Sequence, residues 1–235
     1  MLMAVLALAS LAMAPGLREK IAGAAREGIE AVQTFSGLRE GQAACTLPAM
    51  EVYALQLGVY DSGESAESER RRLLSAGIPT MVWQREKMRL ICAVAPSREA
   101  LPLDYADDLD AYVITDALHE VTVRLSAGEG DVEEALALLR MPDDMFALLL
   151  TDEEETPLRD VIAKVRQAAR KADSAHPENA LYTQLAQSLA NWCDLMERTQ
   201  SVADAQSVRH YAAVTMCTLC RELRLALLGS AAQPS

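Results

Sequence analysis

The chain has 235 residues, of which 51% are hydrophobic, 4% aromatic and 24% charged. This composition excludes a wholly disordered or collagen-like chain, and the length allows one or two domains. The formal net charge of −12 argues against nucleic-acid binding, because a nucleic-acid-binding protein needs a basic surface to neutralise phosphates.

The chain opens on the uncharged run MLMAVLALASLAMA, which ends in an Ala-x-Ala sequence typical of signal-peptidase sites. The run is shorter than the roughly 20 apolar residues that span a bilayer as a helix, and no basic residue precedes it. Residues 1–16 therefore predict a signal- or anchor-like apolar helix. Three interpretations stay open: a true start further upstream, a weak export signal, or a buried helix. Residues 17–50 predict a helical stalk and a linker.

Alternating and apolar runs predict four strands, at 52–60, 80–84, 88–95 and 111–114. A helix that runs to Ala76, with Ser65 as its predicted N-cap, separates the first two strands, and Gly77 suits the position just after its C-terminal end. A second helical segment starts at Ser97 and is interrupted by Pro102. The order β-α-β-β-α-β is the ferredoxin-like arrangement, so we predict an α+β domain over 51–115. Its single antiparallel sheet is expected to carry both helices on one face.

The first predicted strand has two different faces. Its expected core face consists of Tyr53, Leu55, Leu57 and Val59. Its other face, expected to be open to solvent, consists of Ala54, Gln56, Gly58 and Tyr60.

The residues over 52–114 resemble SPOR domains, the sporulation-related repeats that bind peptidoglycan. Leu55-Gln56-Leu57-Gly58-Val59-Tyr60 is similar to the V-Q-V-G-A-F opening of that family. Further matches follow in the same order: the A…L…G spacing of the first helix with its Gly77-Ile78-Pro79 exit, the Met88-Arg89-Leu90 strand start, and Ser97-Arg98-Glu99-Ala100. The chain departs from the pattern at Ala93-Val94-Ala95, where the family usually has G-P-F, and at Pro102.

The resemblance implies non-enzymatic binding of peptidoglycan glycan strands stripped of stem peptides, at a bacterial division or sporulation septum. The expected glycan-binding residues are Gln56, Gly58, Tyr60, Gln84 and Arg89. An amide offers donors and an acceptor, a glycine permits close approach of a ligand, and a tyrosine offers a ring face and a hydroxyl. Each also has a structural interpretation: Gln56 as a solvated sheet residue, Tyr60 as cover for the sheet edge, and Arg89 as half of a surface ion pair.

Residues 116–156 form an acidic extension. The stretch from Asp116 to Asp160 holds thirteen acidic and three basic residues and so carries most of the net charge. The alternation in His119–Leu125 predicts a fifth strand, either added to the sheet edge or part of a second unit, and a helix is expected from Val132 to Arg140. No ligand spacing such as D-x-D-x-D-G is present, so solvated caps and loops are favoured over a metal site.

Three helical patterns close the chain, and together 157–230 predict a helical hairpin or three-helix bundle. This region is interpreted as an interaction module for a membrane or septal protein, or as a partner that packs beside the sheet. The chain has five cysteines, an odd number without regular spacing, so they are expected to be buried small hydrophobes; Cys217-x-x-Cys220 falls in an apolar helical pattern.

Catalytic motifs such as H-E-x-x-H, G-x-S-x-G and a P-loop do not occur in the sequence, and no cofactor is implied. The favoured function is therefore a membrane-anchored or exported peptidoglycan-binding protein that faces the cell wall. The alternative is an intracellular protein-interaction scaffold with a ferredoxin-like domain and no glycan role. An enzyme with a site in the acidic region comes third.

Overall fold

The computed structural model describes residues 29–31, 42–103, 109–126, 132–151, 156–175 and 180–231. Within these ranges the chain has an α+β fold with five helices and two antiparallel sheets. The α+β class is confirmed. The apolar segment expected over 1–16 lies outside the described residues, and none of the described helices is long and apolar enough to cross a membrane.

The larger sheet has the strand order β4-β5-β3-β6. Its strands are β3 (Met50–Tyr60), β4 (Met81–Gln84), β5 (Met88–Ala95) and β6 (Tyr112–Leu118). The first and third of these strands in the chain lie in the centre, and all neighbouring pairs are antiparallel. This is the arrangement that a split β-α-β-β-α-β unit produces. The second helical segment, predicted to start at Ser97, is not a helix over 97–102, where the chain forms bends and turns, and its residues 104–108 lie outside the described ranges.

Helix α3 (Gly63–Ser75) connects β3 to β4. Its N-cap is Ser62, whose hydroxyl oxygen accepts a hydrogen bond from the backbone N–H of Ser65 at 3.2 Å. The prediction that Ser65 is the cap is therefore wrong by one turn. Gly77 has φ +83°, a left-handed conformation that glycine adopts without strain, so its predicted role at the helix end is confirmed.

The smaller sheet was not predicted. It consists of β1 (Ile29–Ala31), β2 (Gln42–Leu47) and β7 (Val121–Ser126) in the order β1-β7-β2. The expected stalk and linker over 17–50 are thus wrong at β1 and β2. The strand expected near 119–125 is confirmed as β7. Two placements were open, the edge of the predicted sheet or a second unit, and the structure shows the second, because β7 belongs to the smaller sheet. Cys45, Leu47, Val121 and Val123 are all buried, so one face of this sheet belongs to the core.

The two sheets are joined by two interrupted strands. β2 pairs with β7 as far as Leu47 and Val121, and β3 pairs with β6 from Met50 and Leu118. Four residues at the break have no partner in either ladder: Pro48, Ala49, His119 and Glu120. Proline has no backbone N–H to donate, which favours a break at this point.

Arg224 fills the break between the sheets. Its side chain donates to the carbonyl oxygen of Pro48 at 2.9 Å and to that of His119 at 3.0 Å. Two further bonds of 2.7 and 2.6 Å join its guanidinium to the carboxylate of Asp143. Arg224 is only 2% exposed. Its bidentate ion pair with Asp143 therefore neutralises a positive charge inside the protein.

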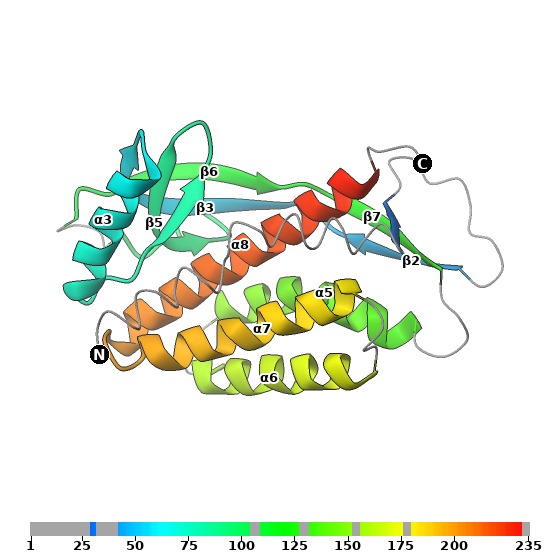
Figure 1. The fold of residues 1–235 in the computed structure, drawn as a ribbon. Helices are drawn as coiled ribbons and strands as arrows, with labels where there is room; N and C mark the ends of the chain where they lie inside the picture. The colour runs from blue at the N-terminus through cyan, green and yellow to red at the C-terminus, as the bar shows by residue number, and fades with distance from the viewer. Residues whose placement is uncertain are drawn as a thin grey trace.

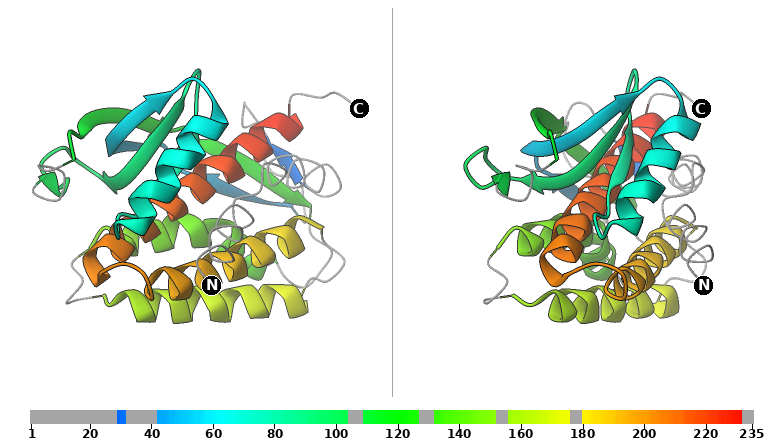
Figure 2. Two further views of the ribbon diagram at one scale, coloured as in Figure 1. Left: turned by 60° about the vertical axis from the view of Figure 1, so that its left-hand side comes forward. Right: turned by 90° about the vertical axis from the view of Figure 1, so that its left-hand side faces the viewer.

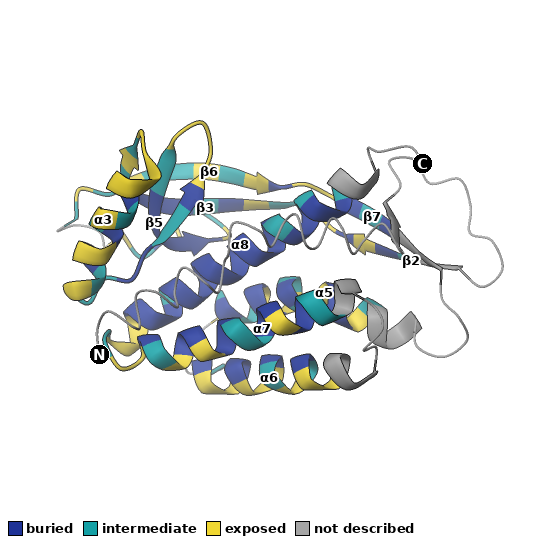
Figure 3. Ribbon diagram, viewed as in Figure 1, coloured by how far each residue is buried: buried dark blue, intermediate teal, exposed yellow. Residues whose placement is uncertain are grey.

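Four helices complete the fold: α5 (Val132–Leu149), α6 (Leu158–Ala175), α7 (Ala180–Thr199) and α8 (Ala205–Ala231). α8 runs between the sheets on one side and α5, α6 and α7 on the other (Figures 1 and 2). Almost all of its described side chains from 207 to 227 are buried (Figure 3). α5 continues past the predicted end at Arg140 and through Pro142 to Leu149.

One hydrophobic cluster includes residues of both sheets and of helices α5, α6, α7 and α8. The predicted helical bundle therefore shares its core with the strands. A smaller cluster lies on the other face of the larger sheet, where Leu55, Cys92, Ala93 and Ala95 pack with Leu101. The larger sheet is thus covered on both faces.

We predict that Arg224→Met lowers the free energy of unfolding by about 3–5 kcal/mol, because it leaves the largely buried Asp143 carboxylate and the carbonyl groups of Pro48 and His119 without their partner. Urea denaturation followed by circular dichroism measures the loss. The matched control is Arg72→Met, which removes an exposed ion pair with Glu69 and is expected to cost less than about 1 kcal/mol. Equal losses in the two variants would contradict the structural role of Arg224.

Candidate functional site

The five expected glycan-binding residues lie in the larger sheet but do not form one surface. Gln56 is only 6% exposed, and its side-chain oxygen accepts a hydrogen bond of 2.5 Å from the guanidinium of Arg89. Tyr60 and Gln84 both lie beside Met88 in the ladder, since Met88 pairs with Tyr60 on β3 and with Gln84 on β4. Gly58 lies beneath the ring of Tyr60.

A β-bulge in β3 separates these residues into two groups. Gln56 pairs with Ile91 and Gly58 pairs with Leu90, so Leu57 has no partner on β5. Partners in a ladder point to the same face, whereas neighbours along a strand point to opposite faces. Because Ile91 and Leu90 are neighbours, Gln56 and Gly58 are on opposite faces of the sheet. The expected face of Ala54, Gln56, Gly58 and Tyr60 is therefore divided at the bulge.

Helix α8 covers the face that carries Gln56. Ala54, Trp83 and Ile91 belong to the same hydrophobic cluster as the α8 side chains. The indole N–H of Trp83 donates to the hydroxyl of Thr218 at 2.8 Å, which joins the sheet directly to α8. The prediction that this face is open is wrong, because a helix far along the chain packs against it.

A buried charge cluster closes the same side. The guanidinium of Arg221 lies 3.9 Å from the centre of the Trp83 ring, a cation–π contact. Arg221 also forms an ion pair with Asp116 on β6, and the same carboxylate accepts a hydrogen bond from Arg85. Burial lowers the pKa of Arg221, although Asp116 opposes this effect. Arg221 and Asp116 thus hold α8 on the sheet and are largely buried, whereas Arg85 is exposed at the rim of the cluster.

The other group, Gly58, Tyr60 and Gln84, is on the side of α3. A Cβ atom at Gly58 would lie 2.7 Å from the phenol oxygen of Tyr60, so only glycine leaves room for this ring. The space that was expected to admit a ligand at Gly58 is thus occupied by Tyr60. Partial burial and the nearby Glu69 raise the pKa of the Tyr60 phenol, and Arg72 opposes the shift. Gln84 is exposed and Tyr60 is half-buried.

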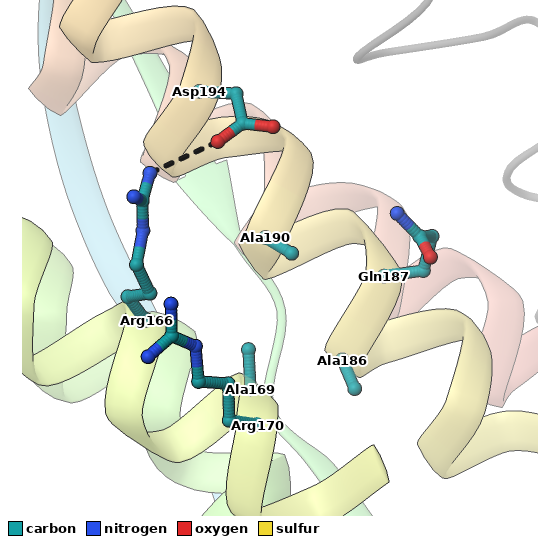
Figure 4. Close-up of a pocket in the computed structure, with 7 residues that line it drawn as sticks. All are labelled: Arg166, Ala169, Arg170, Ala186, Gln187, Ala190 and Asp194. Carbon is teal, nitrogen blue, oxygen red and sulfur yellow. Dashed lines mark hydrogen bonds and ion pairs between the residues drawn. The ribbon is translucent and has the colours of Figure 1, made fainter.

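A hollow of about 230 Å³ lies between α6 and α7 (Figure 4). Its lining consists of Arg166, Ala169, Arg170, Ala186, Gln187, Ala190 and Asp194. The guanidinium of Arg166 is 2.9 Å from the Asp194 carboxylate and 3.1 Å from that of Glu197. Two carboxylates thus already satisfy this cation, and the alanines let the two helices approach closely. The hollow is explained by helix packing.

The cysteines are all buried, as predicted. Burial raises the pKa of Cys92 and of Cys217 to about 12, and that of Cys193 to about 11. Their thiols therefore stay protonated near neutral pH and are poor nucleophiles. Within the described ranges no group of three or more His, Cys, Asp or Glu side chains is placed to hold a metal ion.

Comparison of the chain with known protein families, with curated proteins and with solved structures finds no match in any of the three.

We predict that Gly58→Ala moves the Tyr60 ring toward solvent, because the new methyl group would overlap the phenol oxygen. The pKa of Tyr60 should then fall back toward its ordinary value, as seen by NMR titration of ¹³C-labelled tyrosine. Gly63→Ala is the matched control, since a Cβ at Gly63 meets no atom within 4 Å. An unchanged Tyr60 resonance in Gly58→Ala would show that the ring does not lie over Gly58.

Proposed function

We propose that the chain is a non-catalytic binding protein for peptidoglycan glycan strands. The glycan strand binds on the Tyr60–Gln84 side of the larger sheet. The observation that carries this proposal is the cross-strand row Tyr60–Met88–Gln84 in a sheet of the order β4-β5-β3-β6. The row places an aromatic ring and an exposed amide two strands apart on the face that α8 does not cover.

The chemistry of this row suits a neutral, hydroxyl-rich ligand. A tyrosine ring offers an apolar surface to the C–H faces of a sugar, and its hydroxyl can form hydrogen bonds. The Gln84 side chain offers two donors and one acceptor. Recognition of this kind does not need a basic surface, so the net charge of −12 is no obstacle.

The proposal assigns different roles to the other three residues. Gly58 makes space for Tyr60, while Gln56 and Arg89 bond to each other on the α8 side. They support the sheet and are not assigned to the ligand. We further propose that the protein acts at a division or sporulation septum, anchored at the membrane or exported, with the C-terminal helices available to a septal protein.

The second candidate function is a protein-interaction scaffold without a glycan role. It is favoured by the cover that α8 forms over Ala54, Gln56 and Ile91, which removes one sheet face from any ligand. In this case the Tyr60–Gln84 row would be ordinary surface.

The test is co-sedimentation of the purified protein with peptidoglycan, either intact or stripped of stem peptides by an amidase. We expect enrichment on the stripped form, and a loss of roughly tenfold or more in affinity for the double variant Tyr60→Ala/Gln84→Ala, which removes the ring and the amide together.

The matched control for this test is Leu103→Ala/Gln200→Ala, which removes an exposed apolar side chain and an exposed glutamine outside this row. It should bind like the wild type. No enrichment on stripped peptidoglycan would exclude the glycan function and leave the scaffold. Binding that survives in the Tyr60/Gln84 variant would place the glycan at another surface.

A further inference from the structure

Strand β6 forms one edge of the larger sheet. It pairs with β3 along one side, and the sheet has no described strand beyond it. An edge strand presents a row of backbone N–H and C=O groups that can pair with another strand. β6 extends from Tyr112 to Leu118, so seven residues are available for such pairing.

The edge lacks most of the features that usually prevent strand pairing. The sequence YVITDAL contains no lysine and no proline, and its register with β3 is free of bulges. Its one charged residue, Asp116, points to the α8 side and is held by Arg85 and Arg221. Tyr112 is 66% exposed and is the most exposed large hydrophobic residue among those described.

We propose that β6 pairs antiparallel with β6 of a second copy of this chain, about a twofold axis at Thr115. This register is the one in which the two seven-residue strands overlap completely. It places Asp116 opposite Ile114 of the other copy, so the two carboxylates do not face each other. It also places the exposed Tyr112 opposite Leu118, whose side chain is only 1% exposed and packs in the core of its own copy, so no like charges meet at the ends of the strands either. The strand can thus pair with its own copy over its full length without bringing like charges together, as an isologous interface requires.

The interface is separate from the proposed glycan site. Gln84 is on β4, at the opposite edge of the sheet, and Tyr60 lies on β3 beyond Gln56, the last residue of that strand that pairs with β6. Pairing of one short edge buries less surface than a permanent dimer usually does, so the association should depend on protein concentration.

Disulfide trapping tests this register directly. Directly opposed residues in antiparallel strands have Cα atoms close enough for a disulfide, and Thr115 is exposed. We expect Thr115→Cys to form a covalent dimer with oxidised glutathione roughly tenfold or more faster than Ser68→Cys, an exposed control on α3, because pairing raises the effective concentration of the two thiols. The five native cysteines are buried and give a low background.

A second measurement covers the case in which the cysteine variant behaves abnormally. Sedimentation equilibrium should show concentration-dependent dimers for the wild type and for Ser68→Lys. Thr115→Lys places two like charges at the twofold axis and should remain a monomer with an unchanged melting curve. A wild-type monomer at all concentrations, or equal crosslinking of Thr115→Cys and Ser68→Cys, would overturn the proposal. A monomer that instead captures an added extended peptide would assign the edge to a different partner.

Discussion

The whole arrangement depends on how the break between the two sheets is filled. A long strand pair that changes sheets leaves backbone carbonyls without ladder partners, and burying such groups unpaired is costly. Arg224 satisfies two of them, at Pro48 and His119, and Asp143 on α5 balances its charge. One side chain of α8 thus connects both sheets with α5. Buried side chains of the same helix from Val208 to Leu227 then hold the α5–α7 layer against the strands.

The position of α8 decides which part of the sheet can meet a ligand. Through Trp83, Thr218, Arg221 and Asp116 it closes the face on which Gln56 lies. The bulge at Leu57 then moves Gly58 and Tyr60 to the opposite face, next to α3. A glycan role is consequently proposed for the Tyr60–Gln84 side alone, and the Gln56–Arg89 bond becomes part of the scaffold.

Much of the sheet domain could be predicted from the sequence, because its signals are local. The positions of the strands, the Gly77 turn and the short β4–β5 connection depend on residues close together in the chain, and they agree with the structure, whereas the alternation predicted for β3 is broken at its bulge. Strands β1 and β2 escaped prediction since their partner β7 is distant in sequence and Gln42–Leu47 is rich in small residues. The prediction of an open sheet face was wrong for the same reason, because the helix that covers this face, α8, lies more than a hundred residues beyond β3 in the sequence. One signal was present, namely Arg221 and Arg224 within a mostly apolar stretch of α8 whose other charged residue is Glu222, because arginines in such a stretch indicate buried partners.

The central claim is that α8 is a fixed part of the core and does not act as a detachable cover over the Gln56 face. Native-state hydrogen exchange under increasing denaturant tests it most directly. The amides of α8 between Tyr211 and Leu223 and those of β3 and β5 are expected to open with the same free energy, as one cooperative unit. If α8 instead exchanges through a separate opening of lower free energy while β3 and β5 stay protected, the helix is a removable cover and the account is contradicted.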